Sequence, residues 1–181
     1  MNSADPAQLP GEKLMNTSEL LLAEFDEEMK KTRTALERVP EDKKDFVPHA
    51  KSTPLGKLAP HIAQLAGFGL AILTTPELDF KAGAYKPLPF ESASQLVKAL
   101  DDGAAKARAA LKNTPEEAWT QTWKLRAGDT IIFSGTRFLA YRQMFLNHIV
   151  HHRAQLGVYL RLTETAVPAT YGPSADDRMG F

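Results

Sequence analysis

The chain has 181 residues, a length that suits one domain whose core needs no covalent crosslinks. It contains no cysteine, so disulfides, thiolate metal ligands and cysteine nucleophiles are excluded. Basic and acidic residues number 22 each, and zero net charge argues against a nucleic-acid-binding protein, which normally carries a basic excess. Because no apolar run could cross a bilayer and no leader opens the chain, we expect a cytoplasmic globular protein without membrane or nucleic-acid partners.

The first two helices are predicted from capping signals and apolar spacing. Residues 1–15 are poor in large apolar side chains and are expected to form a flexible arm. Asn16 followed by Glu19 has the spacing of a capping box, and the helix that it starts should end at Pro40. Thr53 and Pro54 give a second start signal.

This second helical stretch carries a histidine among its apolar positions. Leu58, His61, Leu65, Phe68 and Ile72 recur at spacings of three and four. Pro60 lacks a donor and clashes with the carbonyl four residues back, so the helix either begins at Pro60 or bends there. In both cases His61 lies close to a helix N-terminus.

The middle of the chain predicts a long loop and a third helix. Residues 75–90 combine prolines with three aromatic residues, Phe80, Tyr85 and Phe90, which indicates an ordered loop or lid. This aromatic segment could shape a pocket entrance or equally a dimer contact. Ser92 and Gln95 form another capping box, and apolar spacing carries the third helix to about Leu111.

The last third predicts a hairpin followed by the strongest helix. Residues 114–117 should form a short helical turn, and residues 119–133 have extended character with Gly128 in a turn. From about Thr136 to Leu162 one apolar stripe repeats at helical spacing. Its members are Phe138, Tyr141, Phe145, His148, His152 and Tyr159.

Four amphipathic helices in one domain predict an all-α fold, an antiparallel four-helix bundle to which a small hairpin can be added. We place the bundle domain at residues 16–175 and a short C-terminal tail at residues 176–181.

Three histidines are the most informative residues. His148 and His152 lie one turn apart on one helix face, so their imidazoles can aim at one point. His61 falls in the apolar seam of its own helix, and three buried imidazoles without partners would cost about 1–3 kcal/mol each. A shared metal ion would satisfy all three. His151 lies about 100° around the helix from His152 and is expected at the edge, while His49 sits in a polar loop.

The spacing differs from that of the common zinc proteases. Residues 149–151 are Ile-Val-His, so the HExxH glutamate that serves those enzymes as a base is missing.

Residues 147–156, NHIVHHRAQL, closely resemble the NHxxHHRxQL signature of the DinB/YfiT-like metalloenzymes. Residues 167–174, VPATYGPS, resemble the family's VPxxYGPS ending, and residues 58–64 resemble its upstream helix with a central ligand histidine. The resemblance covers roughly residues 15–175. It implies a four-helix bundle, frequent homodimers, and a divalent ion, zinc or nickel, held by His61, His148 and His152.

Relatives of this kind include thiol-dependent transferases and isomerases, so the resemblance also implies a low-molecular-weight thiol and a small-molecule substrate. Three neutral imidazoles leave an ion its full charge, which can hold a thiol as thiolate or lower the pKa of a bound water to about 7. Thiol transfer and hydrolysis both follow, and the resemblance favours transfer. The alternatives are a non-catalytic metal-binding bundle, acting in stress or as a dimeric scaffold, and a histidine cluster without metal.

Other residues are candidates for supporting roles. Gln155, Asn147 and Gln64 could anchor the second ring nitrogen of a ligand histidine. Arg153 either meets an anionic substrate or forms a surface ion pair, which is the commoner role. Aromatic residues that could wall a pocket, though they are more often plain core, are Tyr141, Tyr159 and Trp123. The acidic residues of the first helix indicate a face exposed to solvent, and the sequence singles out none of them as a general base. They are Glu24, Asp26, Glu27 and Glu28.

Overall fold

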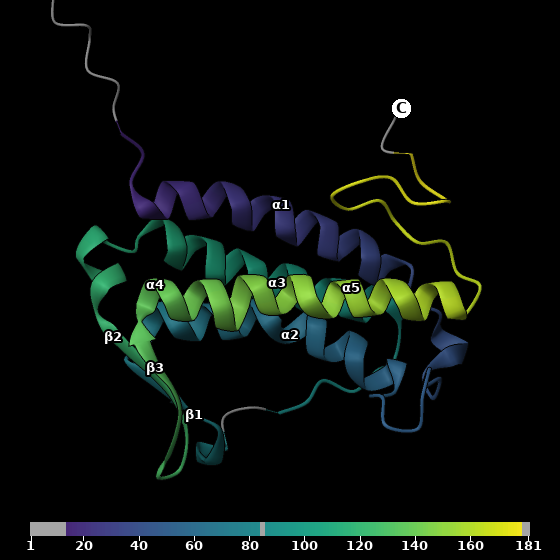
Figure 1. Cartoon of the computed structure of the whole chain (residues 1–181), viewed down its shortest axis with the longest axis horizontal. Helices are drawn as coiled ribbons and strands as arrows, with labels where there is room; N and C mark the ends of the chain where they lie inside the picture. Colours follow the sequence, from purple (N-terminus) through teal and green to yellow (C-terminus); the bar gives the residue numbers. More distant parts are fainter. Residues whose placement is uncertain (1–13, 84–85, 179–181) are drawn as a thin grey trace, which may run out of the picture.

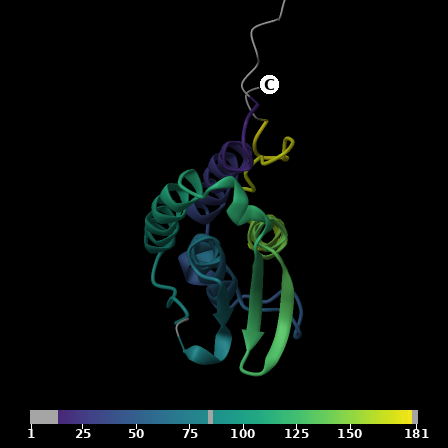
Figure 2. The same cartoon turned by 90° about the vertical axis from the view of Figure 1, so that its left-hand side faces the viewer.

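The computed structural model describes residues 14–83 and 86–178. Four long helical segments lie alongside one another, with a small sheet at one end (Figure 1). They are α1 (Thr17–Glu37), α2 (Leu55–Thr74), α3 (Ala93–Lys112) and a last rod made of α4 (Arg137–Ala140), a π-helical segment (Tyr141–Leu146) and α5 (Asn147–Leu162). Seen end-on, the four rods occupy separate corners (Figure 2). The predicted arm lies outside the described residues except for its last two, as does Tyr85.

The predicted starts of α1 and α3 are confirmed, with one detail changed, whereas α2 has Pro54 rather than Thr53 at its N-cap position. At α1 the Asn16 side chain accepts from the Glu19 backbone N–H at 2.8 Å, and the Glu19 carboxylate accepts from the Asn16 N–H at 2.9 Å. At α3 the Ser92 hydroxyl accepts from the Gln95 N–H at 3.1 Å, but the Gln95 side chain accepts from the N–H of Glu91 rather than Ser92. The second capping box is therefore only half formed.

Helix α2 runs through Pro60, so the expectation that it begins at Pro60 is wrong. It begins at Leu55, and His61 lies in its second turn. The start of the helix is held by the preceding loop, because the Leu55 N–H donates to the Phe46 carbonyl at 3.0 Å and the Gly56 N–H to the Lys44 carbonyl at 2.7 Å. These bonds satisfy donors that a helix N-terminus leaves unpaired.

A three-stranded sheet corrects the all-α prediction. The predicted hairpin forms between β2 (Thr122–Ala127) and β3 (Thr130–Thr136), with Gly128 at φ 61° in its turn. Strand β1 (Glu77–Asp79) lies in the predicted loop and pairs with β2 in parallel. The Asp79 carboxylate accepts from the Gly128 N–H at 2.9 Å, and such bonds to the backbone lower the pKa of Asp79. Short 3₁₀ turns occupy Glu41–Lys43, Phe80–Ala82 and Glu116–Thr120, the last close to the predicted turn.

The π-helical segment redirects the apolar stripe of the last rod. A π turn holds more residues than an α turn, so each residue after it is rotated relative to the pattern expected for a continuous α-helix. Phe138, predicted in the stripe, precedes this segment and is 41% exposed, whereas Phe145 within the segment is fully buried. Gly69 of α2 permits this packing, since a Cβ there would lie 2.8 Å from the Phe145 ring.

Among the described residues, no helix combines the length and apolar character needed to span a membrane.

Candidate metal centre

Three histidines from two helices converge on one point. The Nε2 atom of His61 lies 3.4 Å from Nε2 of His148, which lies 2.8 Å from Nε2 of His152. All three ligand atoms lie within 4.8 Å of one another, and each histidine is partly buried. The structure thus brings together the three predicted ligand residues in an arrangement that could hold a metal ion.

Two of the rings are fixed through their other nitrogen. Nδ1 of His148 lies 3.1 Å from the Met144 carbonyl oxygen, and Nδ1 of His152 lies 2.7 Å from the amide oxygen of Gln155. Because both partners can only accept, each Nδ1 must carry the hydrogen, and each Nε2 is left with its lone pair. Met144 lies in the π-helical segment, so that irregular turn supplies one of the two anchors.

The electrostatics keep the cluster neutral. Burial, followed by the neighbouring rings of His152 and His148, lowers the pKa of His61 to about 4. Burial also lowers the pKa of His148 and of His152, although the bonds to Met144 and Gln155 oppose the effect. Neutral imidazoles are the form that binds metal. Two lone pairs facing each other at 2.8 Å repel, and either a bound cation or a proton on one Nε2 would remove this repulsion.

Two cavities border the cluster. One of about 790 Å³ includes His61 and His148 in its wall, and one of about 480 Å³ includes His61 and His152. The larger volume falls in the range of small-molecule sites. A ligand could therefore reach the ring nitrogens from either cavity.

Of the predicted anchoring residues, Gln155 occupies the expected place. The amide of Gln64 is used elsewhere: its nitrogen donates to the Lys86 carbonyl at 2.9 Å, and its oxygen accepts from the Leu88 N–H at 2.9 Å. Gln64 therefore holds residues 86–88 against the larger cavity. Asn147 is exposed on the last rod, and the second anchor is the Met144 carbonyl. A backbone carbonyl carries no residue-type signal, so sequence reasoning could not have found it.

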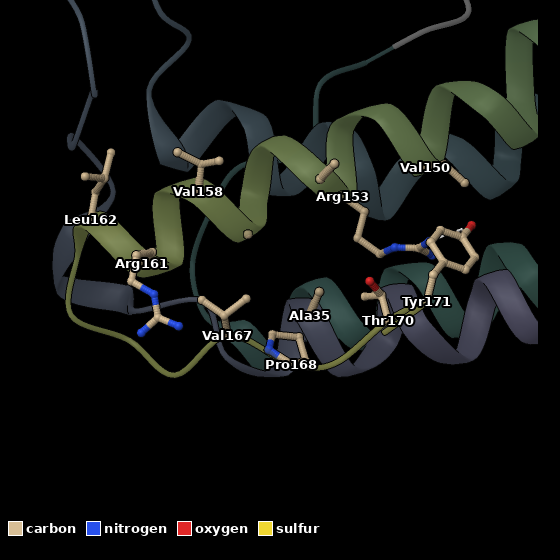
Figure 3. Close-up of a pocket in the computed structure, with 12 residues that line it drawn as sticks. Ala35, Val150, Arg153, Val158, Arg161, Leu162, Val167, Pro168, Thr170 and Tyr171 are labelled. Atoms are coloured by element: carbon tan, nitrogen blue, oxygen red, sulfur yellow. Dashed lines mark hydrogen bonds between the residues drawn. The ribbon is translucent and has the colours of Figure 1, made fainter. Parts of the chain in front are cut away.

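Arg153 lies neither at the cluster nor on the surface. It is buried, and its guanidinium pairs with the buried Glu28 carboxylate at 2.6 Å and donates to the Thr32 hydroxyl at 3.2 Å. The hydroxyl of Tyr171, in the C-terminal segment, accepts from Arg153 at 3.1 Å and donates to Glu28 at 2.6 Å. Figure 3 shows Arg153 reaching toward Tyr171 beside a separate pocket between α5 and the C-terminal segment. The arginine thus ties α5 to α1 and to the VPATYGPS segment.

The remaining predicted candidates are largely structural. Tyr141 and Trp123 are fully buried in the core, whereas Tyr159 lines the smaller cavity and donates to the Thr53 carbonyl at 2.8 Å. His151 is exposed with its ring 4.9 Å from that of His152, and His49 is exposed in a loop. The acidic residues of α1 form ion pairs: Glu24 with Arg142, Asp26 with Arg108, Glu27 with Lys31, and Glu28 with Arg153.

The four helical rods and the histidine cluster place the protein among helical-bundle proteins whose three histidines could hold a metal ion. Comparison with known families narrows this class: the DinB family model matches residues 15–179, and the chain belongs to the DinB family. Among curated proteins no match is found.

Two solved structures show the same fold at low sequence identity. A DinB-like protein from Bacillus subtilis (YjoA) is 19% identical, with 88% of this chain and 99% of that chain covered and a TM-score of 0.61. A DinB-like protein from Bacillus cereus ATCC 10987 is 19% identical, with 86% and 98% covered and a TM-score of 0.63. At this identity the likeness concerns the fold alone.

Proposed function

We propose that the protein is a metal-dependent enzyme in which His61, His148 and His152 hold one divalent ion, zinc or nickel. The observation that carries the proposal is the convergence of three neutral ring nitrogens, two of them held by bonds at Nδ1, beside two cavities. Among the described residues the cluster includes no cysteine or carboxylate, so the donor set has room for a further ligand.

The reaction that we propose is transfer of a low-molecular-weight thiol to an electrophilic small molecule. A bound divalent ion would supply Lewis acidity toward the thiol. In a balanced transfer, a sulfur–carbon bond forms, the bond from carbon to the leaving group breaks, the leaving group takes the electron pair, and the thiol proton passes to water. The residues contribute position: Gln155 and the Met144 carbonyl hold two rings, and the cavity walls orient the reactants.

Hydrolysis at the same site is the second reaction, because an ion of this kind can equally activate water. A third role is a metal-binding protein without catalysis, in stress or as a scaffold. Two incubations distinguish transfer from hydrolysis: one with small thiols and electrophiles, and one with esters alone. Consumption of thiol with one thioether formed per turnover supports transfer. Turnover of esters without thiol supports hydrolysis.

Metal binding itself is tested first, on untagged protein. Zinc titration should give one equivalent per chain in the wild type and in His151→Ala, a matched control because His151 is exposed beside the cluster. His148→Ala should lose the tight site. Absence of stoichiometric zinc, nickel or other divalent ion under any loading condition would refute metal dependence.

We also propose a homodimer in the cytoplasm, where small thiols stay reduced. Light scattering on the eluted protein tests the dimer: a mass near twice the 20.0 kDa of one chain supports it, and a single-chain mass at all concentrations contradicts it.

A further inference from the structure

A groove opens between α5 and the C-terminal segment, on the side of α5 that faces away from the histidines (Figure 3). Its volume is about 430 Å³, within the range of small-molecule sites. Gly157, which lines it, lies about 180° around α5 from His148, at roughly 100° per residue. Within residues 14–83 and 86–178, no residue that lines the groove also lines a cavity beside the histidines. The groove is therefore separate from the candidate metal centre.

The groove is mostly apolar, and it reaches the bundle interior. Ala35 of α1 is 2% exposed and Arg153 is 4% exposed, although both line it. Apolar residues that line the rest are Val150, Ala154, Val158, Leu162, Val167 and Pro168. Val158 and Leu162 are more than half exposed, so an apolar ligand that covers them would remove apolar surface from water. From Val150 to Leu162 the helix extends about 18 Å, at about 1.5 Å per residue, which suits an elongated ligand.

Packing within the protein does not require the glycine at position 157. A glycine inside a helix is destabilising relative to alanine. Gly69 has a packing reason, because a Cβ there would lie 2.8 Å from the Phe145 ring. At Gly157 a Cβ would meet, among the described atoms, only Val167 at an ordinary 3.8 Å. A side chain at this position would fill part of the groove, and the glycine leaves that space to a ligand.

Both cations that line the groove are already neutralised. Arg153 pairs with Glu28 at 2.6 Å, and Arg161 pairs with Asp176 at 2.5 Å. The Asp176 carboxylate also accepts from the Val167 N–H at 2.9 Å, which holds it at the groove. No carboxylate is found among the described residues of the lining. A charged ligand would therefore lose hydration without gaining an unpaired counter-charge, whereas a neutral ligand would not.

One polar side chain of the lining remains available to a ligand. The Thr170 hydroxyl points toward α5 (Figure 3), and it bonds to no other group in the part of the chain that the structure describes. A hydroxyl both donates and accepts. It can therefore bond to the oxygen of an alcohol, a ketone or an ester.

We infer that this groove binds a neutral small molecule with an elongated apolar chain and one oxygen-containing group, such as a medium-chain alcohol or ester, independently of the metal centre. Its oxygen bonds to Thr170, and its chain extends along α5 toward Leu162. Because the ligand contacts α5 and residues 167–171 together, its binding strengthens the attachment of the C-terminal segment to the bundle.

The test uses the full-length protein and 1-octanol, followed by NMR chemical-shift mapping and calorimetry. Octanol should shift the amide signals of residues 150–162 and 167–171, with the same affinity in the presence and absence of zinc. Octanoate, an anion of the same chain length, should bind about 10-fold more weakly. Shifts confined to the region of Leu65 and Phe68, an affinity that depends on zinc, or octanoate binding as tight as that of octanol would overturn the proposal.

Variants that fill the groove give the second arm. Gly157→Leu should weaken octanol binding about 10-fold, the loss expected when about two methylene groups return to water. Ala154→Leu narrows the same groove from an exposed position and should also weaken binding. Gly67→Leu is the matched control, because Gly67 lies inside α2 with open space around its Cβ and lines the larger cavity instead. It should keep octanol affinity within about 2-fold of wild type. Equal weakening in Gly157→Leu and Gly67→Leu, or in Gly67→Leu alone, would refute the groove as the site.

Light scattering distinguishes a small ligand from a second copy of the chain on this surface. If the groove binds a small molecule, Gly157→Leu has the same mass as the wild type. A wild-type dimer that dissociates into chains of 20.0 kDa in Gly157→Leu, together with no octanol shifts, would assign the groove to a dimer interface and contradict the proposal.

Discussion

The bond between Gln155 and His152 should set part of the metal affinity. Gln155→Leu removes the amide oxygen that accepts from Nδ1 of His152 at 2.7 Å, so the ring loses its orientation and its fixed tautomer. Loss of such a partner lowers metal affinity about 10- to 100-fold. Gln155 is exposed and water can take its place, so we expect the low end, about 10-fold or about 1.4 kcal/mol.

A competitive zinc titration against a chromophoric chelator measures this change. Gln64→Leu is the matched control, because the Gln64 amide bonds to the backbone of residues 86 and 88 rather than to a histidine, and Gln64 lines the larger cavity beside the cluster. We expect its zinc affinity to stay within about 2-fold of wild type. An unchanged affinity in Gln155→Leu, or an equal loss in both variants, would show that the anchor plays no specific part.

Three further predictions concern stability. Arg153→Met leaves the Glu28 carboxylate buried without its cation. It should lower the free energy of unfolding, measured with urea, by about 3 kcal/mol and leave zinc affinity unchanged. A variant that is as stable as wild type but binds zinc weakly would contradict the placement of Arg153. In metal-free protein the pKa of His61 is about 4 against an ordinary 6.5, so between these pH values the unfolded chain binds more protons and stability rises with pH. After discounting for the partial exposure of His61, we expect the free energy of unfolding to rise by about 1 kcal/mol across this pH range in the wild type. The contribution should be absent in His61→Leu. An identical dependence of stability on pH in the wild type and the variant would contradict the prediction. Gly69→Ala puts a Cβ 2.8 Å from the Phe145 ring and should lower the free energy of unfolding by about 1–3 kcal/mol. An unaltered unfolding midpoint would show that the two helices do not pack this closely.

The long helices and the hairpin could be predicted because their signals are local. Asn16 and Glu19 lie within one turn, and Gly128 marks a turn between strands that are adjacent in sequence. Strand β1 could not be predicted, since its three residues become a strand only by pairing with β2, about 45 residues further along the chain. Whether such a segment forms a strand depends on its tertiary pairing, and residues 77–79 are too few to show an alternating apolar pattern that would predict one.

The sequence predicted the three histidines of the candidate site, but it predicted the roles of the residues around them less well. The spacing of His148 and His152 places both rings on one helix face whatever surrounds them. The roles of Gln64 and Arg153 depend instead on which segments pack beside them, namely residues 86–88 and α1. The π-helical segment was missed because its sequence has no distinct pattern. Phe138, which precedes it, was predicted in the apolar stripe but is 41% exposed.

His61, His148 and His152 should share one cation. Anomalous diffraction from zinc-loaded crystals, collected at the zinc edge, locates the ion directly. We expect a single strong peak about 2.0–2.1 Å from the three Nε2 atoms, with no fourth protein ligand. A peak elsewhere, such as at His49 or His151, or a fourth side chain that closes the coordination sphere, would contradict a catalytic metal centre.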